Sequence, residues 1–500
     1  MSGRFDFPRL AEAAISRIET LAVHPFILGM YLAFIVFLRE VLEQLFFERY
    51  YSFDQFTHHF FFYIMVFLAG SLLLSLIGKL PILQTTRISS AGFFLIVMPP
   101  LIDRFISLRL EPYSYLLPHE FLKNFFTFFL FTPKAGLGIK VEILTILGLS
   151  SLYISLKTRS VGRVLLAGLS LYVLIALSVT PRLLIPIPQI TGASIWGARH
   201  LIHAFVYLII SLVLGLIYLG RIEKELPKAI FQELATLRTL HFVVMVWAGA
   251  YVHLGLNLVQ FPYSLALLFA SVLMVLLWLS ALLLNNASDL EIDRITNRRR
   301  PLVKGQIRPS LYIHLSLVLG IIILGGSVIF KMTTFFLMFL ALLSSVAYSL
   351  PPLRLRRKIW SPIFIGWGSC LSFLVGYFMG TPLIELSLPK DVFLLALVIF
   401  IAFSLGPLTK DLKDYQGDRQ YGVKTLFTVF GRQKGKRIVT VLLSISLLVP
   451  VFIFHAFPDY VILGALAIVT AILFYVRERL VICYAGYGTV LAYCLLRFLA

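Results

Sequence analysis

The stretch Tyr263–Asp293, YSLALLFASVLMVLLWLSALLLNNASDLEID, joins a long apolar run to an acidic cluster. No Asp, Glu, Lys or Arg lies between Arg238 and Asp289, and then three acidic residues follow within five positions. About 20 consecutive apolar residues cross the hydrocarbon core of a bilayer as a helix, so residues 263–284 predict a membrane span. Carboxylates are costly at bilayer depth and are kept there for function. The acidic end of this span is therefore the first candidate site.

The composition places the chain among polytopic membrane proteins. Of its 500 residues, 59% are hydrophobic and 14% are charged, whereas soluble domains are about 25% charged. The net charge of +20 comes from basic residues between apolar segments. This arrangement suits anionic lipid headgroups or an anionic substrate, and it argues against nucleic acid as a partner. We therefore expect an all-α fold, a transmembrane helical bundle in the lipid bilayer.

The apolar segments fall into two groups. Six spans are expected in the first half, near 23–47, 58–80, 88–107, 139–156, 163–181 and 201–219. Nine are expected in the second half, near 240–258, 263–286, 310–330, 332–350, 361–380, 391–409, 438–456, 459–476 and 480–498. Residues 116–132 are too short to span and predict an interfacial or re-entrant segment, and residues 182–199 predict a loop.

A charged segment separates the two groups of spans and predicts the domain limits. We expect an N-terminal transmembrane domain of unknown function at 1–220, a cytoplasmic linker at 221–239 and a nine-helix domain at 240–500. The loops after the second, fourth and sixth spans of the last domain are rich in Lys and Arg, and the alternate loops carry almost none. The positive-inside rule puts these basic loops in the cytoplasm, which means the plasma membrane if the cell is prokaryotic.

The acidic cluster forms a stripe if it is helical. Asn285, Asp289 and Asp293 are spaced i, i+4, i+8, which places three oxygen ligands on one face of a helix. Asn286 and Glu291 point away from that face. An acidic stretch after a helix is most often a solvated cap, so one stripe by itself is a weak signal.

A second acidic stripe strengthens the first. Asp411, Asp414 and Asp418 are spaced i, i+3, i+7 after another apolar span, on the same predicted side of the membrane. Two such stripes would repel each other without cations between them, and hard oxygen ligands suit Mg²⁺ bound together with substrate phosphates. We expect two Mg²⁺ ions bridged by a diphosphate, with the remaining phosphate charge neutralised by basic residues such as Arg300, Lys304, Arg354, Lys410 and Lys424.

At these residues the chain resembles the UbiA superfamily of intramembrane prenyltransferases, over about residues 228–500. The first family motif reads Asn285-Asn286-x-x-Asp289-x-x-x-Asp293, with Asn286 where Asp is commonest. The other matching stretches are Arg300-Pro301-Leu302-Val303-Lys304-Gly305, Tyr348-Ser349-Leu350-Pro351-Pro352-Leu353-Arg354, and Asp411-x-x-Asp414-x-x-Gly417-Asp418 followed by Gly422-Val423-Lys424-Thr425-Leu426.

The resemblance implies transfer of an isoprenoid chain from an allylic polyprenyl diphosphate to a hydrophobic or aromatic acceptor. It implies catalytic roles for Asp289, Asp293, Asp414 and Asp418, and diphosphate contacts for Tyr348 and Lys424. The acceptor stays open between a quinone-precursor aromatic ring, a tetrapyrrole and a lipid alcohol.

Two other classes of function fit the sequence less well. A cation transporter would also use intramembrane carboxylates, but transporters place them near the bilayer midplane, often within internal repeats, and no inverted repeat is visible here. A non-enzymatic scaffold would not need six aligned carboxylate or amide ligands. In the N-terminal half, His58, His59, His200 and His203 are candidate metal ligands, but packing near the span ends is favoured.

Overall fold

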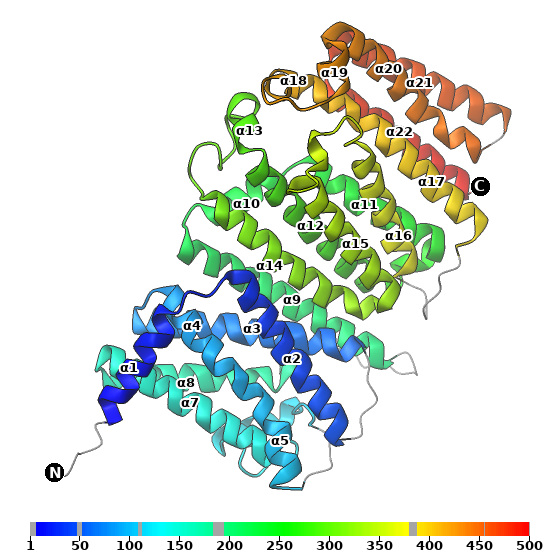
Figure 1. Cartoon of the computed structure of the whole chain (residues 1–500). Coiled ribbons are helices and arrows are strands. Elements are labelled where there is room, and N and C mark those ends of the chain that lie inside the picture. The colour runs from blue at the N-terminus through cyan, green and yellow to red at the C-terminus, as the bar shows by residue number, and fades with distance from the viewer. Residues whose placement is uncertain are drawn as a thin grey trace. The chain divides into compact units, whose positions relative to one another are not determined.

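The structure is a computed structural model that describes residues 7–47, 53–108, 113–183, 195–379, 388–454 and 456–499 (Figure 1). Within these ranges the chain is helical and contains no strand. Thirteen segments of the described residues are long and apolar enough to cross a membrane. The predicted all-α, polytopic fold class is therefore confirmed.

The chain divides into two compact units, Met1–Lys228 and Ala229–Ala500. The division falls inside the predicted linker, and the limits 1–220, 221–239 and 240–500 stay a prediction. Part of the predicted linker 221–239 is helical, because helix α10 occupies Leu226–Leu234. Glu233 on α10 is buried, and burial raises the pKa of its carboxyl group.

The first unit holds six of the candidate spans. Residues 118–126 form a short 3-10 turn and helix α6, too short to span, where an interfacial segment was expected. Of the expected loop 182–199, residues 184–194 lie outside the described ranges, and helix α9 already begins at Ile195. The helices are α1 (Phe7–Thr20), α2 (Pro25–Phe47), α3 (Phe53–Gly78), α4 (Ile82–Phe93), α5 (Met98–Phe105), α6 (Phe121–Phe126), α7 (Leu137–Thr158), α8 (Val161–Ser178) and α9 (Ile195–Ile222).

The second unit contains a long helix at each of the nine predicted spans. They are α11 (Leu237–Leu254), α12 (Tyr263–Ser288), α14 (Pro309–Ser327), α15 (Lys331–Ser349), α16 (Ile363–Phe378), α17 (Lys390–Leu405), α20 (Arg432–Leu448), α21 (Phe457–Arg477) and α22 (Leu480–Leu499). Three short helices, α13 (Leu290–Thr296), α18 (Asp411–Gln420) and α19 (Leu426–Phe430), lie at one end of this unit (Figure 1).

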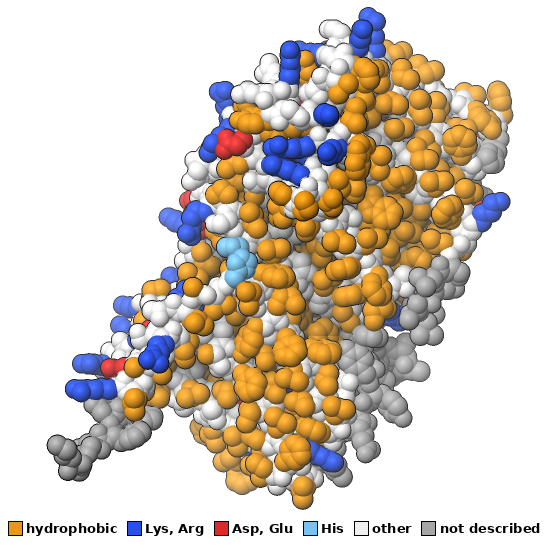
Figure 2. All heavy atoms as spheres, in the orientation of Figure 1, with side chains coloured by type: hydrophobic (Ala, Val, Ile, Leu, Met, Phe, Trp, Pro, Cys, Tyr) orange, Lys and Arg blue, Asp and Glu red, His pale blue; other side chains and the backbone are white. Residues whose placement is uncertain are grey.

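Helix α12 is the most deeply buried of the candidate spans. In its 18-residue apolar window, 72% of the residues are buried inside the structure. Figure 2 shows that hydrophobic side chains cover most of the visible face of the molecule, as expected for a surface that meets lipid.

Helices α11 and α16 touch through their backbones. A Cβ atom on Gly249 of α11 would lie 1.9 Å from the carbonyl oxygen of Phe373, and one on Gly376 of α16 would lie 1.9 Å from the carbonyl oxygen of Val246. No side chain fits at either position, so glycine on both helices fixes their separation. Small residues at such contacts are how helices approach closely in a bilayer.

Candidate active site

A cavity of about 420 Å³ lies inside the second unit. Its polar end is lined by residues from the ends of α12, α15 and α17 and from the segments that follow them, namely Asn285, Asp289, Asp293, Asn297, Arg300, Tyr348, Arg356, Lys410 and Asp414. Its other walls are apolar and aromatic, and include Phe242, Trp278, Leu282, Phe364, Leu371, Phe403, Tyr487 and Leu491.

The first stripe lies on one wall of the cavity. Helix α12 ends at Ser288 and α13 begins at Leu290, but the helical hydrogen bonds continue through the break. The Asp289 amide donates to the Asn285 carbonyl oxygen, and the Asp293 amide donates to the Asp289 carbonyl oxygen, each at 2.9 Å. All three side chains of the stripe line the cavity.

The two residues predicted to point off the stripe do not line the cavity. The Asn286 side chain is buried, and its Oδ1 atom accepts a hydrogen bond from Arg300 Nη1 at 2.6 Å. Glu291 is exposed and pairs with Arg294 at 2.8 Å. Asn286 stands where the family motif usually has Asp. In this structure it holds the side chain of Arg300, which lines the cavity.

The second stripe lies on α18, which packs against α13. Gly417 allows this approach, because a Cβ atom there would lie 2.7 Å from Thr296 Cγ2. Asp414 lines the cavity, whereas Asp411 and Asp418 are buried beside it and are not part of its lining.

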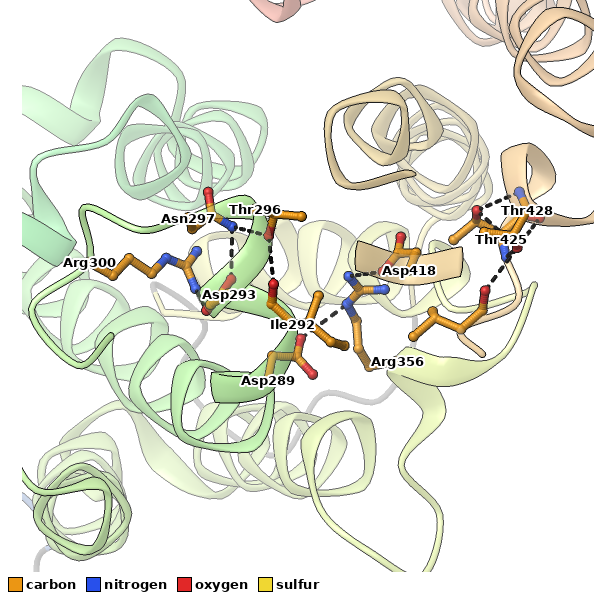
Figure 3. A network of polar contacts seen from close by, with 11 residues as sticks. Asp289, Ile292, Asp293, Thr296, Asn297, Arg300, Arg356, Asp418, Thr425 and Thr428 are labelled. Carbon is orange, nitrogen blue, oxygen red and sulfur yellow. Dashed lines mark hydrogen bonds and ion pairs between the residues drawn. The ribbon is translucent and has the colours of Figure 1, made fainter. Parts of the chain in front are cut away.

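Arg356 links the two stripes. Its Nε atom lies 3.3 Å from Asp289 Oδ2, and its Nη2 atom lies 3.3 Å from Asp418 Oδ1. Figure 3 shows the guanidinium group between the two carboxylates, with Asp293 and Arg300 forming a separate pair nearby. We expected a positive charge between the two stripes, because their carboxylates would otherwise repel each other. In this structure the guanidinium group of Arg356 supplies that charge.

The sequence did not identify Arg356. It lies in the basic run 354–358, in which Arg354 was the favoured member. Arg354 adopts a left-handed backbone conformation with φ of 41°, and the 3-10 turn Leu355–Arg357 follows it. This turn directs Arg356 inward, and no local pattern in the run distinguishes the inward residue from its neighbours.

The other predicted phosphate-binding residues separate into two groups. Arg300, Tyr348 and Lys410 line the cavity. Lys304 and Lys424 are exposed outside it, and Arg354 Nη2 instead donates a hydrogen bond to the Ser288 carbonyl oxygen at the end of α12, at 2.7 Å. The structure also adds His241, unpredicted from the sequence, which lines the cavity and contacts Ser369 Oγ through Nε2 at 2.8 Å.

Burial shapes the charges at the polar end. Desolvation raises the pKa of Asp293, and the neighbouring Arg300 only partly offsets this effect. Burial alone would lower the pKa of Arg356, but Tyr348, Asp289 and Asp418 outweigh it and raise that pKa well above its usual value. Arg356 is therefore a permanent cation in the site.

Oxygen atoms at the polar end fit a magnesium ion. Among the described residues, no group of three or more His, Cys, Asp or Glu side chains is gathered closely enough to hold a metal. However, Asn285 Oδ1 and Asp414 Oδ1, on residues that line the cavity, and Asp418 Oδ2 beside it are buried, and none has a hydrogen-bond partner in the part of the chain that the structure describes. Mg²⁺ commonly binds through one or two carboxylates, completing its shell with substrate phosphates and water. The free oxygen atoms of Asn285, Asp414 and Asp418 suit a Mg²⁺ ion that is held partly by the protein and partly by substrate phosphates and water.

The fold and the cavity define an all-helical integral membrane protein with an acidic and basic site at the ends of its helices. Residues 242–484, which lie within the second unit, match the model of the UbiA prenyltransferase family.

Two curated proteins and one solved structure illustrate what the chain is similar to. Digeranylgeranylglyceryl phosphate synthase of Sulfurisphaera tokodaii is 26% identical over 231 residues, which cover 45% of this chain and 79% of the relative. Homogentisate phytyltransferase of Synechocystis is 30% identical over 211 residues, covering 38% of this chain and 63% of the relative. The structure of a UbiA homologue from Archaeoglobus fulgidus bound to GPP and Mg²⁺ aligns with a TM-score of 0.43 at 16% identity, over 53% of this chain and 96% of that one.

Proposed function

We propose that the second unit transfers an isoprenoid chain from an allylic polyprenyl diphosphate to a small acceptor, with Mg²⁺ as cofactor. The observation that carries the proposal is the two-part cavity. One end presents carboxylates and cations, and the rest is apolar and aromatic. A prenyl diphosphate has the same division between a charged head and a hydrocarbon chain.

At the polar end, we assign the diphosphate and its metal ions to the two stripes. Asn285, Asp289 and Asp293 would hold one Mg²⁺, and Asp414, with Asp411 and Asp418 behind it, would hold the second. Bound Mg²⁺ would neutralise charge on the diphosphate and make it a better leaving group. The basic residues of the cavity, Arg300, Arg356 and Lys410, would bind the phosphate oxygens that remain. Lys304, Arg354 and Lys424 lie outside the cavity and would act only if their segments moved inward.

The apolar end would hold the reacting carbon and its chain. When the bond to the diphosphate breaks, the allylic carbon becomes electron-poor, and aromatic faces stabilise such a centre. Phe242 and Trp278 line the cavity with their ring centroids 4.8 Å apart. Apolar walls also exclude water, which would otherwise capture the carbon in place of the acceptor.

We assign the polar end to the cytoplasmic side, because the basic loops that supply it carry the positive-inside signal. A diphosphate made in the cytoplasm would reach the site directly, while its chain and a hydrophobic acceptor enter from the bilayer. The relatives' names include a glycerol phosphate lipid product and a homogentisate acceptor. We therefore keep a quinone-precursor ring, a tetrapyrrole and a lipid alcohol as the acceptor classes.

A product assay tests the proposal. Membranes containing the full chain are incubated with labelled prenyl diphosphates of several lengths, Mg²⁺ and a panel of the three acceptor classes, and products are identified by mass spectrometry. We expect a prenylated product that disappears on chelation of Mg²⁺ and in the Asp289→Asn variant. Full product formation by membranes that contain the Asp289→Asn variant would refute the assignment of the site.

A further inference from the structure

The first unit contains buried polar groups that prenyl transfer does not use. Glu40 lies on α2, His58 and His59 lie on α3, and His203 and Tyr207 lie on α9. Glu40, His58, His203 and Tyr207 are all at least nine-tenths buried. They belong to helices predicted to span the membrane, where buried ionisable groups are expensive and are retained for function.

Several of these groups already satisfy one another. His59 Nδ1 forms a short contact with Glu40 Oε1. His58 uses both ring nitrogens, with Nδ1 lying 3.1 Å from His200 Nδ1 and Nε2 lying 2.8 Å from the Tyr115 hydroxyl. The sequence predicted packing for these histidines, and the structure adds hydrogen-bond contacts for His58 and His59.

Two buried atoms of the cluster remain without a hydrogen-bond partner among the described residues, His203 Nε2 and the Tyr207 hydroxyl. His203 Nδ1 lies 2.8 Å from the Arg199 carbonyl oxygen. A carbonyl oxygen can only accept, so Nδ1 carries the proton, and in the neutral ring Nε2 is left as an acceptor. The site thus offers an acceptor at His203 and a donor at Tyr207. A buried polar group left unpaired is unfavourable, because its lost hydrogen bonds to water are not replaced.

The two side chains face the same neighbours. They are separated by four residues on α9, which places them on one face of the helix, and their ring centroids lie 6.1 Å apart. Both rings stack on His58 of α3, at centroid distances of 4.9 Å for His203 and 5.8 Å for Tyr207. Phe62 and Tyr115 complete an aromatic wall, with Phe62 packed edge-on to Tyr207 and Tyr115 stacked on His203.

We propose that His203 and Tyr207 form a second ligand site, which binds the hydroxyl group of a lipid-soluble phenol or alcohol. A hydroxyl group is both donor and acceptor. It can therefore donate to His203 Nε2 and accept from the Tyr207 hydroxyl, while the aromatic wall holds the adjoining carbon skeleton. A metal ion fits less well, because no group of three or more His, Cys, Asp or Glu side chains among the described residues is placed to hold one.

Photolabelling of the full chain in lipid nanodiscs tests the proposal. The probe is a long-chain para-alkylphenol that carries a diazirine, and the competitors are the unlabelled alkylphenol and the alkylbenzene of the same chain length, which lacks the hydroxyl group. Labelled peptides are located by mass spectrometry, and affinity is obtained from competition. Variants are compared only after gel filtration and thermal melting show that they are folded.

We expect saturable labelling of the segment that contains His203 and Tyr207, displaced by the alkylphenol and not by the alkylbenzene. Tyr207→Phe and His203→Phe should each weaken binding about fivefold, the effect of one hydrogen bond between neutral groups. Tyr218→Phe is the matched control, because Tyr218 is on the same helix and its hydroxyl already contacts Thr86 at 2.9 Å. It should bind as the unmodified chain does.

Equal displacement by the alkylbenzene would overturn the proposal, as would unchanged affinity in Tyr207→Phe and His203→Phe. Labelling confined to the second unit, or no saturable labelling at all, would also overturn it. The Asp289→Asn variant separates this result from the transferase proposal, because loss of prenyl transfer should leave labelling of α9 intact.

Discussion

Removal of the Arg356 guanidinium group should destabilise the second unit strongly when Mg²⁺ is absent. In Arg356→Met, the carboxylates of Asp289 and Asp418 would lose the cation between them. The side chains of Arg356, Asp289 and Asp418 are 8%, 7% and 0% exposed, so water cannot replace the lost charge. Loss of one partner from a buried ion pair costs about 3–5 kcal/mol. At the lower limit, and with about 2–4 °C per kcal/mol for a unit of this size, the melting temperature should fall by roughly 6–12 °C.

Intrinsic fluorescence during heating measures this change. Four of the five tryptophans, Trp247, Trp278, Trp360 and Trp367, lie in the second unit, so their signal reports mainly on its unfolding. The measurement is made on the full chain in detergent, first with a chelator and then with increasing Mg²⁺. Because Mg²⁺ would supply positive charge between the same carboxylates, it should raise the melting temperature of the variant more than that of the unmodified chain.

Arg294→Met is the matched control. Arg294 is a neighbouring arginine, and its pair with Glu291 is more than half exposed. Exposed pairs contribute about 0–1 kcal/mol, so its melting temperature should change little. If Arg356→Met melted like the unmodified chain in the presence of chelator, the bridging role of Arg356 would be wrong. If Mg²⁺ stabilised both proteins equally, the metal would not bind between these stripes.

Four further predictions concern the cavity. Asp414→Ala should lower prenyl transfer by about 100-fold or more, the scale seen when one electrostatic contact to a reacting group is removed, whereas Glu291→Gln should retain activity in the same assay because Glu291 lies outside the cavity. Asn286→Asp should leave the Mg²⁺ requirement unchanged in a titration of activity, because Asn286 contacts Arg300 and does not line the cavity; a large drop in that requirement would contradict its placement. Burial raises the pKa of Asp293, so protons should compete with Mg²⁺ there at a higher pH than at an ordinary Asp. The Mg²⁺ concentration for half-maximal activity should therefore rise as the pH is lowered, and a constant requirement would argue against Asp293 as a ligand. Removal of Mg²⁺ with a chelator should abolish transfer and re-addition should restore it, and activity that survives chelation would exclude the metal role.

The features that the sequence predicted well depend on short-range periodicity. The apolar run of α12 has the length of a span, and the spacing of Asn285, Asp289 and Asp293 places them on one face whatever surrounds the helix. Hydrogen bonds across the junction at Asp289 preserve that spacing although α12 formally ends one residue earlier. Local helical geometry was therefore sufficient to predict this wall of the cavity.

The features that the sequence did not predict depend on contacts between distant segments. Arg356 meets Asp289 and Asp418 from a turn that is far from both in the chain. The pairing of His59 with Glu40 joins α2 to α3, and the two residues are 19 positions apart in the sequence. Asp411 and Asp418 share the predicted face of α18, but the packing of that helix on α13 decides that Asp414 lines the cavity. Such outcomes follow from tertiary packing, which periodicity does not encode.

The backbone contact between α11 and α16 limits how this cavity can change during evolution. Because Gly249 and Gly376 leave no room for a methyl group, the two walls cannot move apart or together by substitution at their crossing without loss of the fold. Changes in the length of the isoprenoid chain that fits the cavity must then come from the side chains that line it, such as Phe242 on α11 and Leu371 on α16. Engineering of substrate length should target those side chains and keep both glycines.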